Sequence, residues 1–273
     1  MNNVKVLFAM LDKPMSVQSK LRTFYDAQAE KYFLTRNKHR ADADIFLHEI
    51  QSCNKKTINI LEFGCWSGRL LAHLGNIPWI KIHYTGVDLS KNLLAIAKKQ
   101  FDTKNLSMIS TAKFVCDDIL TYITWCKQES FDFVIGIASF QHIPTVRERF
   151  FLTKNIYRIL KYNGKIMMSN RSFSRRFIKK YQKNLIDALR KYIVSFGKHQ
   201  RNDIMIPRKH ENTIVKRFYH IYTLAELKKF IALSGFIIDT LWYLGHTWMV
   251  HSSRKDAKNT LVIGTKTIFR WKN

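Results

Sequence analysis

Two glycines and three acidic residues are spaced as expected for a site that binds a nucleotide-like ligand. Glu62 ends a short apolar run, and Gly64 and Gly68 follow it before a helical pattern resumes in LEFGCWSGRLL. Glycine has no Cβ, so it suits a loop whose backbone must turn sharply or approach a ligand closely. Asp88 and Asp117 follow two further apolar runs. Carboxylates at such points can accept hydrogen bonds from a ligand, although the glycine loop alone would also fit a plain strand-to-helix turn.

Alternating apolar runs and helical patterns indicate how these residues could be brought together. Strands are predicted at about residues 58–63, 81–88, 112–117, 131–140 and 165–170, with helices between them. This alternation implies a parallel sheet with right-handed crossovers, in which ligands bind at the carboxyl ends of the strands. Glu62, Asp88, Asp117 and residues 138–142 all fall at such ends, so we expect them along one edge of the sheet.

Four regions are predicted along the chain. They are an N-terminal helical lid (1–54), a Rossmann-like core (55–170), a basic insertion (171–222), and a final helix with two strands that complete the core (223–273). The insertion is expected to contain one helix and then an irregular loop that includes Pro207. The expected fold class is therefore α/β, with a doubly wound, seven-stranded, mostly parallel sheet, the helical lid, and a basic helical insertion after the fifth strand.

The chain is strongly basic, with 46 Lys and Arg residues against 20 Asp and Glu and a formal net charge of +26. The excess is densest between residues 171 and 216, which contain thirteen Lys or Arg and three acidic residues. Such a surface favours a polyanionic partner such as nucleic acid. A coding bias toward Lys, Asn and Ile would make the surface basic without a function, so both explanations stay open at this point.

Other classes of protein are disfavoured. No run approaches the roughly 20 apolar residues that a membrane helix needs, and the N-terminal segment has no small-residue cleavage site. The four cysteines, Cys53, Cys65, Cys116 and Cys126, form no CxxC pair and no Cys/His cluster with zinc spacing. We therefore expect a cytoplasmic protein with reduced thiols and no bound metal.

Several segments together resemble the class I S-adenosylmethionine-dependent methyltransferases. LEFGCWSGR is similar to the first motif of that family, GVDLS to its second-strand acid, and VCDDIL to its adenine-contacting strand end. FDFVIGIASFQHI and ILKYNGKIMMS resemble its fourth and fifth strands, so the resemblance covers about residues 55–170. It implies S-adenosylmethionine as the cofactor. Trp66 departs from the pattern, because the family commonly has a third glycine there.

The resemblance also implies a role for each matching residue. Asp88 would bind both ribose hydroxyls, Asp117 the adenine amino group, and Glu62 the methionine amino group. The other residues expected to contact or cover the cofactor are Tyr32, Arg36, Gly64, Cys65, Trp66, Gly68, Leu89, Asp118, Ile119, Ala138 and Ser139. Ordinary structural explanations compete with these roles: Asp88 could cap a helix, and Tyr32 and Arg36 could belong to a helix surface or core.

A narrower resemblance lies at the two ends of the chain. FYDAQAEKYFLTR and KRFYHIYTLAELKKFIALSGF are similar to segments of the tRNA wobble-uridine carboxymethyl methyltransferases. This implies tRNA as the favoured acceptor, with a small activator protein as a further partner. The cations expected to grip phosphate are Arg171, Arg175, Arg176, Lys179, Lys180 and Arg201. The alternatives are a methyltransferase for a small carboxylate, hydroxyl or amine, and a non-catalytic relative that binds RNA or a partner protein.

The catalytic candidates follow from what methyl transfer requires, which is a nucleophile held in line with the methyl group. A carboxylate acceptor is already ionised at neutral pH, whereas a hydroxyl or amine would need a base. His142 is the candidate base, with an ordinary pKa of about 6.5. Gln141 stands where the wobble-uridine family has a second histidine. Arg217, Tyr219 and His220 in RFYH could meet the acceptor, or could simply pack on the sheet.

Overall fold

The computed structural model describes residues 16–35, 41–104, 106–196, 199–210, 213–245, 250–251, 253 and 255–267. One large sheet has the strand order β3-β2-β1-β4-β5-β10-β8-β9, and a second sheet pairs β6 with β7. The strands are β1 (Thr57–Phe63), β2 (Lys81–Asp88), β3 (Ile109–Cys116), β4 (Phe131–Ile137), β5 (Leu160–Arg171), β6 (Asp203–His210), β7 (Thr213–His220), β8 (Phe236–Leu244), β9 (Val250–His251) and β10 (Asn259–Lys266).

The large sheet has the predicted doubly wound organisation. β1 to β5 run parallel to one another, and β10 runs antiparallel between β5 and β8. The two-residue β9 extends the edge of this seven-stranded arrangement. The predicted α/β fold class is confirmed.

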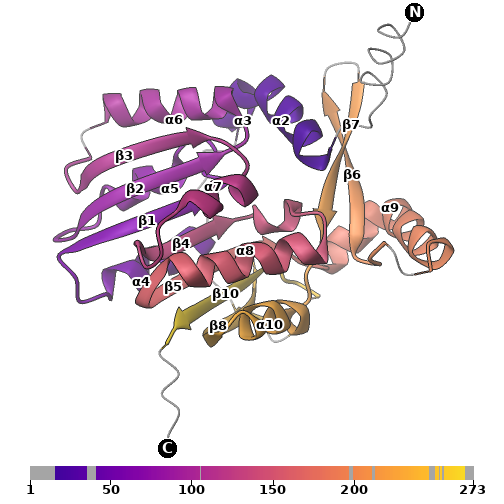
Figure 1. Ribbon diagram of the computed structural model, residues 1–273. Coiled ribbons are helices and arrows are strands. Elements are labelled where there is room, and N and C mark those ends of the chain that lie inside the picture. Colours follow the sequence, from indigo (N-terminus) through magenta and orange to yellow (C-terminus); the bar gives the residue numbers. More distant parts are fainter. Residues whose placement is uncertain are drawn as a thin grey trace, which may run out of the picture.

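Helices cover both faces of the sheet (Figure 1). They are α2 (Val17–Ala27), α3 (Ala29–Thr35), α4 (Ala41–Gln51), α5 (Arg69–Leu74), α6 (Lys91–Thr103), α7 (Ile119–Trp125), the short 3₁₀ helix η1 (Phe140–His142), α8 (Val146–Ile159), α9 (Arg175–Val194) and α10 (Leu224–Leu233). Apolar residues of α4, α5 and α6 form one core with the sheet, and those of α7, α8 and α10 form another. β4 is almost continuously apolar because helices bury both of its faces.

The N-terminal helices α2 and α3 form a lid at the end of the molecule where the parallel strands finish, next to the β6–β7 hairpin (Figure 1). Asp26 of α2 holds this lid to the start of α6. Its Oδ1 accepts hydrogen bonds from Ser90 Oγ at 2.6 Å and from the Asn92 backbone N–H at 3.1 Å. The Asn92 amide also donates to the Asp26 carbonyl at 3.0 Å. The same Ser90 side chain caps α6, so lid docking and the start of α6 depend on one hydroxyl.

The insertion after β5 contains the predicted helix, α9, but a hairpin replaces the predicted irregular loop. Ile204, Ile206 and Tyr219 alternate along the two strands and pack with Phe177 of α9 in a small separate core. Their period-two spacing was a strand signal, yet Pro207 lies among them and favoured a loop. In a two-stranded sheet a proline can occupy an outer edge, where its missing N–H removes no bond from an inner ladder.

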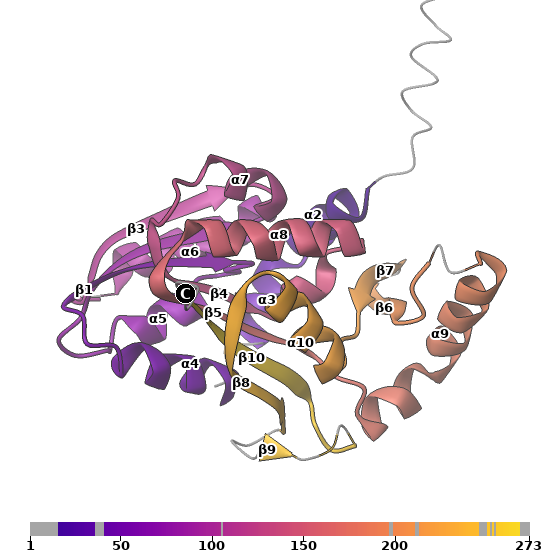
Figure 2. The same cartoon turned by 60° about the horizontal axis from the view of Figure 1, so that its bottom comes forward.

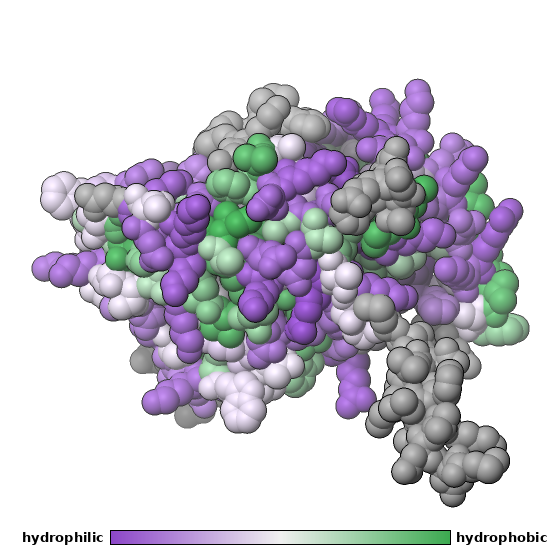
Figure 3. Space-filling view, turned by 90° about the horizontal axis from the view of Figure 1, so that it is seen from above, coloured by the Kyte–Doolittle hydropathy of each residue, from purple (hydrophilic) through white to green (hydrophobic). Residues whose placement is uncertain are grey.

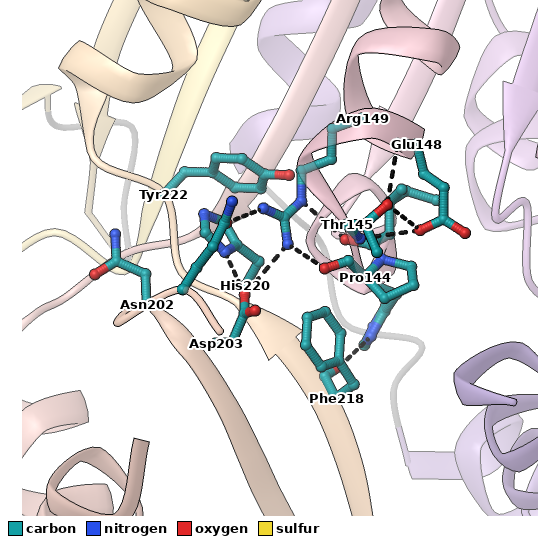
Figure 4. Close-up of polar contacts among 12 residues, drawn as sticks. Pro144, Thr145, Glu148, Arg149, Asn202, Asp203, Phe218, His220 and Tyr222 are labelled. Atoms are coloured by element: carbon teal, nitrogen blue, oxygen red, sulfur yellow. Dashed lines mark hydrogen bonds and ion pairs between the residues drawn. The ribbon is translucent and has the colours of Figure 1, made fainter. Parts of the chain in front are cut away.

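Buried polar contacts fix the base of the hairpin to the core (Figure 4). Arg149 of α8 donates to the carbonyls of Ile143 and Pro144 at 2.9 and 3.0 Å. It also pairs with Asp203, the first residue of β6, at 3.3 Å. Asp203 in turn lies 2.6 Å from Nδ1 of His220, the last residue of β7. Both ends of the hairpin are therefore tied to one buried arginine.

The hairpin and α9 together project beside the large sheet (Figures 1 and 2). The face seen from above is mostly hydrophilic, and its hydrophobic residues form small separate patches (Figure 3). Within the part of the chain that the structure describes, no helix is both long enough and apolar enough to cross a membrane.

Candidate active site

A cavity of about 470 Å³ lies at the carboxyl ends of the parallel strands, under the lid. Residues from the lid, from the loops after β1, β2, β3 and β4, and from β7 line it. The predicted cofactor residues that line it are Tyr32, Glu62, Gly64, Cys65, Trp66, Asp88, Leu89, Asp117, Asp118, Ile119, Ala138 and Ser139. Gly68 lies outside its wall, and Arg36 lies outside the described residues.

The two glycines of the first loop have different structural roles. Gly64 has φ +68°, and a Cβ there would lie 2.1 Å from Ser139 Oγ. Only glycine combines this backbone angle with so close an approach, so the loop after β1 packs directly on the loop after β4. Gly68 has φ +74° and begins α5, where a Cβ would lie 3.2 Å from the Cβ of Ala97 on α6. Gly68 therefore sets the spacing between two helices and does not form the cavity wall.

Trp66 occupies the position where the resembling family commonly has glycine. Its φ is 57°, a left-handed conformation that costs a non-glycine residue about 1–2 kcal/mol. Its backbone N–H donates to Asp88 Oδ2 at 2.9 Å. Its ring lies 5.9 Å from the Tyr32 ring and 4.6 Å from the Arg69 guanidinium. The indole therefore forms part of the cavity wall between the lid and α5.

Asp88 ends β2 with its carboxylate held by backbone donors. Its two oxygens accept the N–H groups of Trp66 and Ser90, each at 2.9 Å. Burial raises the pKa of Asp88 from 3.8 to about 6, and the two N–H donors oppose that rise. The group is therefore ionised at neutral pH, and each oxygen keeps a lone pair for a ligand hydroxyl.

Asp117 and Asp118 follow β3, and Glu62 lies near the end of β1. These acids differ in the hydrogen bonds that they already accept from the protein. Asp118 caps α7 by accepting the Leu120 N–H at 3.0 Å, and Asp117 accepts the Asp118 N–H at 2.7 Å. The capping role of Asp118 favours Asp117 as the carboxylate that meets a ligand amino group. Glu62 accepts the hydroxyl of buried Tyr84 at 2.6 Å. We call Glu62, Gly64, Trp66, Asp88 and Asp117 the cofactor end of the cavity.

His142 lies in η1, after β4, and is held by the hairpin. Its Nδ1 is 2.8 Å from the backbone oxygen of Phe218, so Nδ1 carries the hydrogen and Nε2 is left as an acceptor. Nε2 lies 3.5 Å from the Tyr25 hydroxyl of the lid. Burial lowers the pKa of His142 from 6.5 to about 4; the bond to Phe218 opposes this and the charge of Arg217 adds to it. The imidazole is therefore neutral at pH 7.

Arg217 and Tyr219 come from β7 and line the cavity beside His142. Arg217 Nη1 donates to the Tyr25 hydroxyl at 3.2 Å, and its guanidinium lies 4.9 Å from the Phe24 ring and 5.2 Å from the Tyr219 ring. The Tyr219 ring lies edge-on to His142, with 4.5 Å between centroids. We call Tyr25, His142, Arg217 and Tyr219 the acceptor end of the cavity.

The structure does not bring the fourth catalytic candidate, His220, into the cavity. Successive side chains of a strand point to opposite sides, so His220 faces away from the side of Tyr219. It is buried, with Nδ1 2.6 Å from Asp203 (Figure 4) and Nε2 2.7 Å from Glu226. Its predicted catalytic role is therefore corrected to a structural one at the base of the hairpin.

The six cations predicted to bind phosphate do not form one group. Arg171 lines the cavity. The other five are exposed on α9 or just before β6, namely Arg175, Arg176, Lys179, Lys180 and Arg201. The basic surface of the insertion is thus separate from the wall of the cavity.

Two lid residues, Tyr25 and Asp26, help to form the cavity or hold the lid in place but were not among the predicted site residues. Tyr25 and Tyr32 are seven positions apart, about two helical turns, and their rings lie 5.9 Å from each other. That spacing is a sequence signal that Tyr25 lies on the same side of the lid as Tyr32. Asp26 had no such signal, because its partners Ser90 and Asn92 belong to a distant segment.

The cofactor end fits S-adenosylmethionine, the cofactor that the resemblance implies. Asp88 offers two acceptor oxygens of the kind that a ribose diol requires. Gly64 lines the same cavity, and Asp117 follows the neighbouring strand β3.

Comparison with known proteins agrees with this geometry. Residues 60–164 match the methyltransferase domain family. Malonyl-[acyl-carrier protein] O-methyltransferase of Bacillus anthracis is 28% identical over 113 residues, which are 41% of this chain and 37% of that protein. Phosphoethanolamine N-methyltransferase 2 of Caenorhabditis elegans is 34% identical over 88 residues, 32% of this chain and 18% of that protein. The chain thus spans well under half the length of these curated relatives.

The fold is also similar to a solved structure over most of its length. A crystal structure of a SAM-dependent methyltransferase from Methanosarcina mazei has a TM-score of 0.62 at 19% identity, and the match covers 81% of this chain and 97% of that one. The tRNA wobble-uridine family is not among these matches, so the narrower resemblance stays a prediction. The chain therefore contains a methyltransferase domain, and its fold is shared with a solved SAM-dependent methyltransferase.

Proposed function

We propose that the protein transfers a methyl group from S-adenosylmethionine to a small organic acceptor. The observation that carries this proposal is the acceptor end of the cavity, where buried Arg217 and Tyr219 lie beside Tyr25 of the lid. The cavity of about 470 Å³ must hold both the cofactor and the reacting part of the acceptor. Small-molecule sites typically have volumes of about 300–1,000 Å³. An acceptor group that enters this space is therefore small.

The cofactor supplies an electrophilic methyl group on a positively charged sulfur. Asp88 would hold its ribose hydroxyls, Asp117 its adenine amino group and Glu62 its methionine amino group. The buried carboxylates of Asp88 and Glu62 restrict the bound geometry, since each is already fixed by a protein donor. Orientation of this kind supplies much of the rate enhancement in a simple group transfer.

The lid excludes water from the acceptor end and completes its wall. Tyr25 and Tyr32 close the cavity from above, and Asp26 holds their helices against α6. A hydroxyl or amine acceptor would have to give up a proton, for which His142 Nε2 is the nearest neutral nitrogen at this end. An acceptor that is already an anion would need no such transfer.

The names of the relatives support a small acceptor. One acts on a malonyl group held on acyl-carrier protein, and another on phosphoethanolamine. Both acceptor groups are small, whereas the favoured expectation from the sequence was tRNA. The small-molecule alternative therefore becomes the leading proposal.

Tritium transfer from labelled S-adenosylmethionine would test it. The protein is incubated with a small-molecule extract and, separately, with total tRNA, and label is counted in each product. We expect label in the small-molecule fraction and background in tRNA. The matched control is Asp88→Ala, which should lose transfer to any acceptor. Label found only in tRNA would reject the proposal.

A second candidate, tRNA methylation, is favoured by the exposed cations of α9. Arg175, Arg176, Lys179 and Lys180 follow one another on a helix that projects beside the sheet (Figure 2). A phosphate-driven interface would weaken steeply with salt. In this second candidate the activator protein implied by the narrower resemblance would be a partner. Arg175→Gln/Arg176→Gln should then reduce transfer to tRNA and leave cofactor binding intact.

A further inference from the structure

We propose that the acceptor carries a carboxylate that binds to Arg217, and that this carboxylate is the group methylated, giving a methyl ester. This inference rests on the proposed function, because it names the substrate class for the acceptor end. It depends on how Arg217 is placed and on what surrounds it.

Arg217 is a buried cation beside the cavity. Its side chain is 6% exposed and lines the cavity. Nη1 donates to the Tyr25 hydroxyl, and buried Nε has no hydrogen-bond acceptor. Among the residues that the structure describes, no Asp or Glu lies within ion-pair distance of this guanidinium. An arginine side chain remains charged at any pH that the protein would meet.

Arg149 shows how the same fold treats a buried arginine that has only a structural role. It is 0% exposed, and it donates to Asp203, to Gln200 and to the carbonyls of Ile143 and Pro144. Its charge and its N–H groups are therefore matched by protein oxygens (Figure 4). Arg217 has one hydroxyl and aromatic faces instead. A buried charge is normally paired, so the contrast indicates that a ligand supplies the missing anion.

The chemistry of a guanidinium favours a carboxylate at this position. Arginine presents planar N–H donors that match the two oxygens of a carboxylate. The guanidinium carbon of Arg217 lies over the rings of Phe24 and Tyr219, and these aromatic contacts use none of its N–H donors. Donors other than the one bound to Tyr25 therefore remain for a ligand. The acids that line the cavity belong to the cofactor loops, so none competes with an acceptor anion for this arginine.

The surroundings of Arg217 also favour the carboxylate as the reacting group. His142 is neutral and holds its Nε2 toward Tyr25, so it is a weak base for a hydroxyl or amine. A carboxylate needs no base. One carboxylate oxygen forms a bond to the methyl carbon, the bond between that carbon and sulfur breaks, and its electron pair stays on sulfur. The products are a methyl ester and S-adenosylhomocysteine, and no proton is transferred.

The first experiment measures binding without turnover. Protein saturated with S-adenosylhomocysteine is titrated with straight-chain monocarboxylates and with the matching amides at constant ionic strength, and the shift in Tm is recorded. We expect acids to raise Tm more than amides in the wild type. Arg217→Met should abolish that difference, Arg217→Lys should retain part of it, and Lys216→Met, an exposed neighbour on the same strand, should behave as wild type.

The stability of the unliganded protein separates a binding role from a structural one. Removing a buried charge that has no partner should leave Tm of Arg217→Met unchanged or raise it. A structural arginine such as Arg149 would lower Tm when replaced. A large fall in Tm for Arg217→Met, or an acid response that survives in it, would overturn the inference.

The second experiment identifies the methylated group. Label transferred from tritiated S-adenosylmethionine into a small-molecule extract is treated with mild base, which releases methanol from methyl esters but not from ethers or N-methyl groups. We expect most label to be released, with transfer about 10- to 100-fold lower in Arg217→Met, the range set by a charge-assisted hydrogen bond.

The outcomes distinguish the inference from the proposed function. Base-stable label would reject a carboxylate acceptor and leave small-molecule methylation standing. Failure of the wild type to bind S-adenosylhomocysteine, or binding that Asp88→Ala does not weaken, would reject the proposed function itself.

Discussion

The two ends of the cavity are built in opposite ways. The cofactor end takes its residues from consecutive strand–loop–helix units between Glu62 and Asp117, and each acid lies at the carboxyl end of its own strand or directly after it. The acceptor end takes Tyr25 from the lid, His142 from η1, and Arg217 and Tyr219 from the hairpin. The first end presents acids that accept hydrogen bonds from protein donors, and the second presents one cation, Arg217, among neutral and aromatic groups.

This difference explains how one domain could serve different acceptors. The cofactor end depends on local loop geometry that the central sheet imposes. The acceptor end depends on how the lid and the hairpin dock, so changes in those two additions would alter the acceptor without disturbing the cofactor loops. Gly64 of the cofactor end packs on Ser139, which lies three residues before His142 of the acceptor end.

The largest effect is expected from Asp88→Ala, which acts on the cofactor end alone. The change removes the acceptor of two backbone N–H groups and the carboxylate proposed to bind both ribose hydroxyls. Charge-assisted hydrogen bonds contribute about 1.5–3 kcal/mol each, so affinity should fall about 100-fold or more. Isothermal titration with S-adenosylhomocysteine measures this. Asp102→Ala, an exposed acid of α6, is the control and should bind as wild type. Equal affinities for the two variants would remove the basis for a separate cofactor end.

The second largest effect is expected from Gly64→Ala, which acts where the loop after β1 packs on the loop after β4. The new Cβ would lie 2.1 Å from Ser139 Oγ at a backbone φ of +68°. Left-handed strain of about 1–2 kcal/mol and overpacking of about 1–3 kcal/mol should lower the free energy of unfolding and Tm. Adding Ser139→Gly should recover the overpacking part only. A single variant as stable as the wild type would contradict the close contact between these loops.

The smallest effect is a pH dependence of the free energy of unfolding, caused by His142 at the acceptor end. The folded pKa of His142, about 4, lies below its ordinary value of 6.5. Its contribution to stability is therefore present above pH 6.5 and is lost as pH falls through about 4. Between pH 7 and pH 5 the loss should be on the order of 1–2 kcal/mol. Urea unfolding of the wild type and of His142→Gln at both pH values measures this loss, since glutamine does not titrate.

The wild type must be compared with His142→Gln because Asp88 also titrates in this pH range. Its folded pKa is raised from 3.8 to about 6, so its contribution is present below pH 3.8 and is lost as pH rises through about 6. The two groups change stability in opposite directions over the same range. Identical pH dependence in the wild type and His142→Gln would show that His142 titrates normally.

Much of the fold and of the cofactor end could be predicted because the signals are local. An apolar run that ends in Asp88 and is followed by Ser90 specifies a strand, its polar end and a helix cap within a few residues. The hairpin was predicted wrongly because Pro207 outweighed the alternation of Ile204 and Ile206. His220 was assigned to the wrong side because, without the strand, its orientation relative to Tyr219 was unknown.

By itself, the sequence determined the sheet and the order of the acids along its edge, since both depend on short-range patterns that a parallel sheet aligns. Its resemblance to a known family implied the cofactor. Only the tertiary structure decided which side chains share the acceptor end, because Tyr25, His142 and Arg217 meet through packing between distant segments. The tertiary structure also distinguished Arg149, which the protein pairs with Asp203, from Arg217, which is left for a ligand. In the sequence both are arginines in basic segments, and only their hydrogen-bond partners in the folded protein show that their roles differ.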